Sequence, residues 1–562
     1  MGSAGTLSAD GARRIADAFV HYNAEFREIT RRAVRHFDER QWAAREHDSV
    51  ARIELYEHWV DRTVKQMATL LVDQQGDRRL WQDIREQFSL RVSGLPDAAF
   101  MRTFYSSVAR RSLGTIGVDT DTEFAADSID PLEGISPSAE TVRYPNRGGL
   151  EWLVENLLGD LRLRSPWIDF EKSVLHVRQQ LAAVGDIQRI DILRPLFCQS
   201  TRAYLVGKIT LLDETVRPLA IALQNTERGL IIDAVMTSED EVSILFGFTR
   251  SYFHVDLERV VEAVVFLRAL LPKKPLSELF AALGRIKQGK TERYRELMLH
   301  LQRSQDQFQH AAGERGLVMV CFTLPSLDVV FKLIRDRFPP VKNVVRQDVL
   351  DKYRFVFRHD RAGRLVDAQE FKRVRLPRAR FSEALLEELA TETAETVHTE
   401  GDDLIFDHMY IERRMTPLNL YVREAAPHLA ERAVVDYGQA IRDLAYSNIF
   451  AGDLLLKNFG VTRHGRVIFY DYDELCPVTD CRFRDIPEAT NDEDEMRSEA
   501  WYHVNDNDVF PETFINFLAF DEGQKAAFLR THGDLLTADF WRALKKRLKA
   551  GEILEVLPYR KA

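Results

Sequence analysis

The first eighty residues carry apolar side chains at steps of three and four. Between about residues 12 and 83 the sequence is rich in Ala, Arg, Glu and Leu, and its periodic apolar positions include Ile15, Phe19, Tyr22, Phe26 and Ile29. Such spacing places the apolar side chains on one face of a helix. We therefore predict long amphipathic helices here, and further helices at residues 257–271 and 291–308.

Short runs rich in β-branched and aromatic residues separate these helical stretches, at residues 219–224, 229–235 and 242–248. Turn-forming or charged residues bound each run, which is typical of strands. Residues 1–308 are therefore predicted to form a mainly helical domain with a small sheet. We recognise no catalytic motif in this part of the sequence.

The pattern changes near Ala311, where strand-like runs become frequent. Residues 317–323 and 329–334 flank a turn at Pro325, which predicts a pair of strands. Residues 353–358 are predicted to form a hairpin with residues 364–366. The region therefore begins with a small β-rich lobe.

Helical periodicity returns after this lobe. Residues 382–397 predict a helix with Ser382 as its N-cap, and residues 404–411 predict a buried strand. Residues 427–447 predict a longer helix, since Val434, Tyr437, Ile441 and Leu444 share one face. That helix leads directly into a polar loop at Asp453, and helical sequence follows to the C-terminus.

The loop begins a set of three polar residues with a characteristic spacing. Asn458 follows Asp453 by five residues, and Asp471 follows Asn458 by thirteen, after an apolar strand at 467–470. In protein kinases this spacing joins an Asp that accepts a hydroxyl proton to an Asn and a second Asp that bind the metal. A single Asp-x-x-x-x-Asn motif is more often a polar surface loop, so the interpretation depends on its surroundings.

Two features upstream support a phosphate site. The segment Ala311, Ala312, Gly313, Glu314, Arg315, Gly316 and Leu317 places two glycines before a strand, where backbone amides can approach a phosphate. Lys332 interrupts the apolar strand at 329–334, where it could bind the α- and β-phosphates. Taken separately, the glycines would indicate an ordinary turn and Lys332 an edge-strand lysine that faces water.

The order of these features predicts the fold. Loop, strand lysine, helix, Asp/Asn pair and second Asp follow one another as in kinases, and Lys457 beside Asn458 is assigned to neutralising the γ-phosphate. We predict an α+β fold: a mainly helical domain with a small sheet at 1–308, and a bilobed protein-kinase-like domain at 309–562. Its β-rich N-lobe covers about 309–411 and its helical C-lobe about 412–562.

The composition and charge of the chain argue against several classes of partner. The 562 residues have a formal net charge of −10, which argues against general nucleic-acid binding. No stretch is long and apolar enough to cross a membrane, and the charged first twenty residues do not resemble a secretory signal. Four cysteines do not make a disulfide framework. We expect a cytoplasmic protein without membrane or nucleic-acid partners.

Two other motifs carry less weight. Cys476 and Arg482 have the C-x5-R spacing of cysteine phosphatases, but the intervening residues include a Pro and an Asp and no Gly. That chemistry needs a nest of open amides and a depressed thiol pKa, so we interpret the match as chance. The acidic run at 488–499 lies where kinases keep their substrate segment. A partner-docking role there is a hypothesis, and a solvated surface is the alternative.

With these residues in place, the sequence resembles the bacterial isocitrate dehydrogenase kinase/phosphatase family. The similarity covers most of the chain and is most specific at Phe322-Thr-Leu-Pro-Ser326, Tyr410-Ile-Glu-Arg-Arg-Met415, Leu456-Lys-Asn-Phe-Gly460 and Tyr470-Asp-Tyr-Asp-Glu474. The resemblance implies phosphorylation and dephosphorylation of a serine of isocitrate dehydrogenase, which would control flux between the Krebs cycle and the glyoxylate bypass. It also implies that residues 1–308 form a regulatory domain, and it implies ATP or ADP, Mg²⁺ or Mn²⁺, and AMP as an allosteric effector. We expect a homodimer as the candidate oligomer.

The resemblance assigns roles to individual residues. It places the nucleotide loop on residues 311–317, the phosphate lysine on Lys332, the catalytic base on Asp453 and the metal ligands on Asn458 and Asp471. A functional carboxylate of the family matches Asp367, whose role rests on the resemblance alone. The adenine-binding hinge falls on Glu412, Arg413, Arg414 and Met415.

Three departures from the general kinase pattern stand out. Ala451-Gly452 replaces the His-Arg before the catalytic Asp, and Asp473 replaces the Gly of the metal motif. No Glu lies between Asp336 and Tyr353, where the helix that pairs with the strand lysine is expected. Asp348, Asp351 or Glu388 could take over that pairing.

These assignments predict one cleft for both activities. Asp453 would orient the incoming serine hydroxyl, and Asp473 is the candidate for the extra hydrolytic task, through ADP as phosphate acceptor or by direct attack of water. Two alternatives remain at this point. One is a small-molecule kinase of the aminoglycoside or choline type, and the other is a catalytically inactive kinase-like scaffold.

Overall fold

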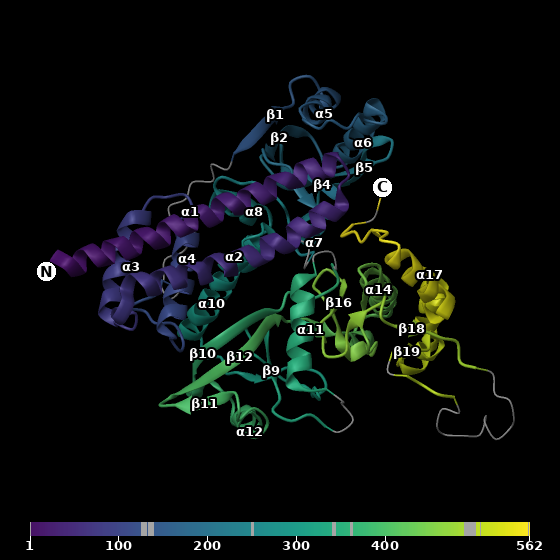
Figure 1. Ribbon diagram of the computed structural model, residues 1–562. Helices are drawn as coiled ribbons and strands as arrows, with labels where there is room; N and C mark the ends of the chain where they lie inside the picture. The colour runs from purple at the N-terminus through teal and green to yellow at the C-terminus, as the bar shows by residue number, and fades with distance from the viewer. Residues whose placement is uncertain are drawn as a thin grey trace.

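The computed structural model describes residues 2–124, 132, 140–248, 252–339, 344–359, 363–487, 502–505, 507–559 and 561. These residues form an α+β fold in which a mainly helical regulatory domain precedes a bilobed kinase-like domain, as the sequence predicts (Figure 1). Within them, no helix has both the length and the apolar character needed to cross a membrane. The acidic run at 488–499 lies outside the described residues.

Four helices open the regulatory domain. Helices α1 and α2 run side by side (Figure 1), and the predicted stripe with Phe19 and Tyr22 faces Tyr56, Phe100 and Phe104 in an aromatic core. The periodic apolar residues therefore form the helices that their spacing predicts. The elements are α1 (Gly2–Asp38), α2 (Trp42–Leu71), η1 (Val72–Gln74), α3 (Arg78–Val92) and α4 (Ala98–Leu113).

A six-stranded antiparallel sheet completes this domain. Its order is β1-β2-β4-β5-β6, with β3 paired to β4. Helices α5 and α6 pack on one face and α7, α8 and α9 on the other, so the central strands are apolar on both sides. The strands are β1 (Thr141–Pro145), β2 (Ile187–Leu193), β3 (Phe197–Gln199), β4 (Arg202–Leu211), β5 (Val216–Thr226) and β6 (Gly229–Met236). The helices are α5 (Leu150–Gly159), α6 (Phe170–Ala182), α7 (Glu239–Phe246), α8 (Val260–Leu270) and α9 (Leu276–Ala282).

The strand predicted at 242–248 is wrong, because residues 242–246 belong to helix α7. Ser238 and Glu241 form a capping box, in which each side chain accepts from the other residue's backbone N–H. This pair satisfies amides that a helix start leaves open, and it outweighs the strand preference of the following apolar residues.

Helix α10 (Ile286–Arg303) leads into the kinase-like domain, whose N-lobe sheet has the order β10-β12-β9-β8-β7 with β11 paired to β12. Strands β8 and β9 form the antiparallel pair predicted around Pro325. The elements are β7 (Gln309–His310), β8 (Met319–Thr323), β9 (Val329–Ile334), α11 (Arg346–Arg358), β10 (Gln369–Pro377), η2 (Arg378–Arg380), α12 (Glu383–Glu392), β11 (Val397–Glu400) and β12 (Asp403–Arg413).

Two predictions in this lobe need correction. The hairpin proposed for 353–358 is wrong, since these residues end helix α11, where Val349, Tyr353 and Val356 form a buried stripe at steps of four and three. The helix predicted at 382–397 is shorter: α12 ends at Glu392, and the chain then enters β11. Ser382 is the N-cap residue, but its side chain makes no capping hydrogen bond.

The C-lobe is helical, as predicted. Helix α14 lies at its centre and packs against α16 and the small sheet β13-β15-β16. The elements are β13 (Thr416–Pro417), α13 (Leu418–Glu424), α14 (Pro427–Tyr446), β14 (Ile449–Phe450), η3 (Leu456–Asn458), β15 (Phe459–Val461), β16 (Val467–Phe469), β17 (Cys476–Pro477), β18 (Arg482–Phe483), β19 (Asp508–Val509), η4 (Pro511–Phe517), α16 (Glu522–His532), η5 (Gly533–Leu536) and α17 (Ala538–Lys549).

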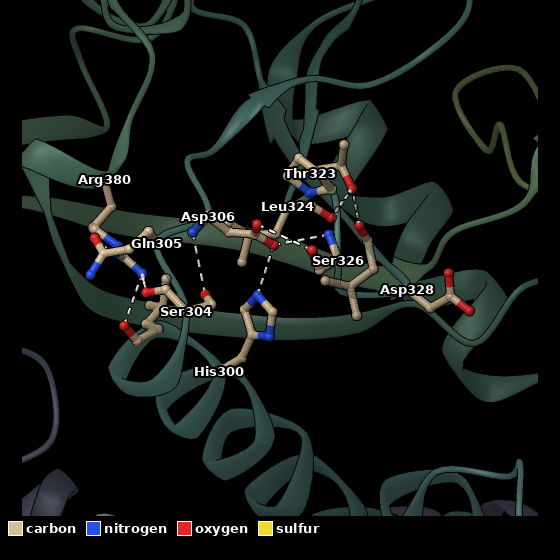
Figure 2. Close-up of polar contacts among 12 residues, drawn as sticks. His300, Ser304, Gln305, Asp306, Thr323, Leu324, Ser326, Asp328 and Arg380 are labelled. Carbon is tan, nitrogen blue, oxygen red and sulfur yellow. Dashed lines mark hydrogen bonds and ion pairs between the residues drawn. The ribbon is translucent and has the colours of Figure 1, made fainter.

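Polar contacts tie the two domains together. Beyond the end of α10, the Asp306 carboxylate lies 2.9 Å from the Nε2 of His300 and accepts from the backbone N–H of Ser326 in the β8–β9 turn (Figure 2). At the other end of the chain, Tyr559 donates to Asp233 of β6 at 2.8 Å. The C-terminal segment thus returns to the sheet of the regulatory domain.

Candidate active site

A cavity of about 410 Å³ lies between the two lobes of the kinase-like domain. It brings together sequence-predicted residues that lie up to about 160 positions apart along the chain. Its wall contains the whole nucleotide loop 311–317 and, in addition, Lys332, Glu412, Arg413, Met415, Asp453, Lys457, Asn458, Asp471 and Asp473. The predicted Asp367 and Arg414 do not line it.

The nucleotide loop connects β7 to β8 at the edge of the N-lobe sheet. Gly313 has a φ of 114°, which side-chain-bearing residues rarely adopt, and a Cβ at Gly316 would lie 2.9 Å from the carbonyl oxygen of Met319. Arg335 donates to the carbonyl oxygen of Gly316 at 3.1 Å and fixes the C-terminal half of the loop. The glycines are therefore required by the shape of the loop.

Lys332 forms a buried ion pair with Glu412. Its Nζ lies 2.8 Å from Oε2 of Glu412, and it also donates to the carbonyl oxygen of Tyr470 at 2.6 Å. The two side chains are only 7% and 2% exposed. Glu388, one of the three partners predicted for Lys332, instead pairs with Arg335 and His310. That prediction is corrected in favour of Glu412.

Burial affects the pKa of both Lys332 and Glu412. It raises the pKa of the Glu412 carboxyl above its ordinary value, and the charge of Lys332 opposes part of the rise. Burial alone would lower the pKa of the Lys332 amine, but Glu412 and other acidic neighbours outweigh it, so this pKa lies above its ordinary value. The lysine is thus held in its charged form at the cavity wall.

The loop that contains the predicted catalytic residue Asp453, which we call the catalytic loop, follows α14 and the short strand β14, which pairs with β17. Gly452 has a φ of 76°, and a Cβ there would lie 2.4 Å from the carbonyl oxygen of Glu474, so only glycine fits. This contact gives a physical reason for the missing His-Arg pair. The next residue, Asp453, accepts from the backbone N–H of Leu455 at 2.9 Å, which orients its carboxylate.

Asn458 and Asp471 lie close together at the end of the β15–β16 pair. Tyr470 donates its backbone N–H to the carbonyl oxygen of Asn458 at 3.1 Å, which brings the following Asp471 next to the loop. The amide nitrogen of Asn458 donates to the carbonyl oxygen of Asp453 at 3.3 Å, so its amide oxygen is left for a cation. Amide and carboxylate oxygens suit Mg²⁺, which usually shares one or two such ligands with substrate phosphates.

In the described part of the chain, no group of three or more His, Cys, Asp or Glu side chains is arranged for a metal ion. The amide oxygen of Asn458 and the carboxylate of Asp471 are donors that could share a metal ion with a phosphate ligand, as the metal ligands of kinases do.

Lys457 spans the cavity toward the nucleotide loop. Its Nζ lies 3.3 Å from Oε2 of Glu314, while both side chains remain partly exposed. Because an exposed ion pair is worth at most about 1 kcal/mol, an incoming phosphate can replace Glu314 as the partner of Lys457.

Asp367 and Arg414 line a second cavity of about 960 Å³, bounded by both domains. Asp367 accepts from the hydroxyl of Tyr252 at 3.2 Å, and Arg414 holds the β8–β9 turn through the carbonyl oxygens of Leu324 and Pro325. The two cavities share a wall that includes Arg413 and Met415. Asp367 and Arg414 therefore line the second cavity and not the one that contains the predicted catalytic group.

Several cavity residues were missed by sequence reasoning. They include His310, Cys321, Arg335, Asn419, Leu455, Tyr470 and Glu474. Most of them lie next to a predicted residue in the sequence or opposite one in a strand pair. Sequence proximity and the register of the strand pair are the signals that could have indicated them. The sequence could have indicated Tyr470, since it directly precedes Asp471. In the structure its ring lies 5.0 Å from the Lys332 amine.

Cys476 and Arg482 do not form a phosphate cradle. The Sγ of Cys476 contacts the Sγ of Cys481 at 3.5 Å, and the Arg482 side chain is 66% exposed. Neither residue lines the active-site cavity. The geometry agrees with the interpretation of this motif as a chance match.

Comparison with known proteins identifies the family. A model of the isocitrate dehydrogenase kinase/phosphatase (AceK) regulatory domain matches residues 12–305, and one of the kinase domain matches residues 306–561. An isocitrate dehydrogenase kinase/phosphatase of Anaeromyxobacter sp. (strain Fw109-5) is 44% identical over 568 residues, which cover 100% of this chain and 98% of the relative. One of Xanthomonas euvesicatoria pv. vesicatoria (strain 85-10) is 44% identical and covers 98% and 96%. The chain therefore belongs to the isocitrate dehydrogenase kinase/phosphatase family.

Proposed function

We propose that this protein phosphorylates a serine of isocitrate dehydrogenase to inactivate it and removes the same phosphate to reactivate it. In this role it would control flux between the Krebs cycle and the glyoxylate bypass. Relatives named isocitrate dehydrogenase kinase/phosphatase match nearly the whole chain, and this supports the proposal. The observation on which it depends most is the single cavity that contains Lys332, Asp453, Asn458 and Asp471.

In the forward reaction, phosphoryl transfer from ATP to the serine, each group of cavity residues would have its own role. Backbone amides of loop 311–317 and the Lys332 amine would bind the phosphates of ATP, with Lys457 at the γ-phosphate. Asp453 would accept the proton of the serine hydroxyl and orient it for in-line attack. Asn458 and Asp471 would hold Mg²⁺ or Mn²⁺, which supplies charge neutralisation for the transferred phosphoryl group.

The reverse reaction is assigned to the same cavity. Asp473 lines it beside Asp471, where other kinases have Gly, and it is our candidate for positioning the attacking water or the ADP that accepts the phosphate. The Cys476 motif offers no competing phosphatase site, because its thiol lies outside the cavity. ATP hydrolysis would follow if ADP is the acceptor.

AMP is proposed to act from the second cavity. Both domains bound this cavity, and its wall contains the cationic side chains of Arg293, Arg463 and Arg466, in addition to Lys274 and Arg413, which pair with Glu278. Such a wall suits a phosphate group, and the shared residue Arg413 provides a route to the active site. Arg463 lines the second cavity and not the active-site cavity. We expect Arg463→Gln to weaken the response of both activities to AMP while the activity without AMP stays at the wild-type level.

The two alternatives are not favoured. A small-molecule kinase is not supported by relatives that match both domains along nearly their whole length. An inactive scaffold would be expected to lack part of the catalytic set, but Lys332, Asp453 and Asp471 all line one cavity. We retain cytoplasmic location and a homodimer as predictions.

A direct experiment tests the proposed function. The pure protein is incubated with ATP, Mg²⁺ and isocitrate dehydrogenase, and the intact mass of the dehydrogenase is measured over time. We expect the addition of one phosphoryl group, and its removal when ATP is replaced by ADP and AMP. An unchanged mass in both conditions would contradict the proposal.

A further inference from the structure

We infer that Glu412 positions Lys332 for catalysis, in the role that a glutamate on the helix after the lysine strand has in most protein kinases. The inference rests on the proposed kinase function, because Lys332 has a catalytic task only if a nucleotide occupies the cavity. Glu412 is a positioning residue here, since it acts through the lysine.

Helix α11 occupies the place of the usual helix but offers no partner for Lys332. Its two acidic residues are engaged elsewhere. Asp348 accepts from the backbone N–H of Val345 at 2.8 Å and so caps the start of the helix. Asp351 accepts from Arg354 at 2.7 Å, and its side chain is 56% exposed.

The sheet register brings Glu412 to Lys332. Tyr410 of β12 lies directly opposite Lys332 of β9, so Glu412, two residues along, projects from the same face as a diagonal neighbour. The pair is shielded from water, which makes an unpaired charge at either position costly. The second carboxylate oxygen, Oε1, is buried and has no hydrogen-bond partner among the described residues, so it is an open acceptor at the cavity wall.

The regulatory domain holds strand β12 on both sides of Glu412. Arg293 of α10 donates to the carbonyl oxygen of Ile411 at 3.3 Å. On the other side, Arg413 forms an ion pair with Glu278 of α9 at 2.8 Å. The position of Glu412, and through it the Lys332 amine, is therefore set by contacts from the regulatory domain and does not require a movement of α11.

Three single variants test the assignment. Glu412→Gln keeps the size of the side chain but removes its charge, Glu412→Asp keeps the charge on a shorter side chain, and Asp351→Asn is the matched control on α11. For each, kcat and the KM values for ATP and for isocitrate dehydrogenase are measured, together with ADP affinity by calorimetry and the melting temperature.

We expect Glu412→Gln to lower kcat by about a hundredfold, because the misplaced lysine no longer supports the transferred phosphoryl group. The KM for isocitrate dehydrogenase should stay within about twofold. Glu412→Asp should keep an intermediate kcat, and Asp351→Asn should match the wild type. In a double-mutant cycle, adding Glu412→Gln to Lys332→Met should cause little further loss, because the two residues act as one unit.

A wild-type kcat in Glu412→Gln would overturn the inference, as would a loss of activity in Asp351→Asn or fully additive losses in the cycle. If Glu412→Gln fails to fold, the intermediate activity of Glu412→Asp decides, and an Asp variant as active as the wild type would overturn the role. Failure of the kinase function itself would look different, because the wild-type protein would then transfer no phosphate.

Discussion

Arg413 of strand β12 and Glu278 of helix α9 form a two-armed ion pair across the domain boundary, with Nη1 of the arginine 2.8 and 3.0 Å from the two carboxylate oxygens. Lys274 lies 3.2 Å from the same carboxylate. Burial alone would raise the pKa of Glu278, but the two cations more than offset it and bring the pKa to about 2. Glu278 therefore links regulatory and kinase-like domains as a charged group.

This pair predicts a loss of stability in acid. Because the folded-state pKa of Glu278 lies below its unfolded value of 4.5, its contribution is complete above pH 4.5 and falls as the pH drops toward 2. The difference corresponds to roughly 3 kcal/mol. We expect Glu278→Gln to lower the free energy of unfolding by this order at pH 7, and by less than half as much at pH 3, as measured by urea denaturation. An equal loss at both pH values would contradict the electrostatic account.

Gly452 gives a prediction about the catalytic loop. Gly452→Ala combines a left-handed backbone with a clash against Glu474, whereas Gly465→Ala has nearly the same φ, 73°, with no atom within 4 Å of the added Cβ. The left-handed backbone alone costs a residue with a Cβ about 1 kcal/mol. We expect Gly465→Ala to lose that much stability and Gly452→Ala to lose more, and only Gly452→Ala to lose most of its kinase activity. Equal kinase activity in the two variants would show that the contact with Glu474 does not matter.

The position of Cys476 predicts that its replacement leaves both activities intact. Its thiol lies outside the active-site cavity and contacts Cys481, so Cys476→Ser should keep both the kinase and the phosphatase activity within about twofold. Phosphate release from phosphorylated isocitrate dehydrogenase measures this. Complete loss of the phosphatase alone would revive the cysteine mechanism.

Short-range features of the site were predictable from the sequence. Asp453, Asn458 and Asp471 lie on one loop and one strand pair, so their spacing along the chain largely determines their geometry. The glycine loop was predictable for the same reason. Helix α14 and strands β8 and β9 also lie where the apolar pattern places them.

Long-range pairings were not predictable. The partner of Lys332 depends on the register of β9 with β12, which are separated by about seventy residues, and the sequence favours no register between them. Residue 414 of the predicted hinge faces the β8–β9 turn, because neighbouring side chains of an extended chain point to opposite sides. Helices α7 and α11 were misjudged because β-branched and aromatic residues suit strands and buried helix faces equally.

The claim that both activities share one cavity is tested most directly with Asp453→Ala. Phosphoryl transfer to isocitrate dehydrogenase and phosphate removal from the phosphorylated dehydrogenase are measured on the same preparation, with folding checked by its melting temperature. We predict that both rates fall by at least about a hundredfold. A variant that loses phosphorylation but removes phosphate at the wild-type rate would contradict the account.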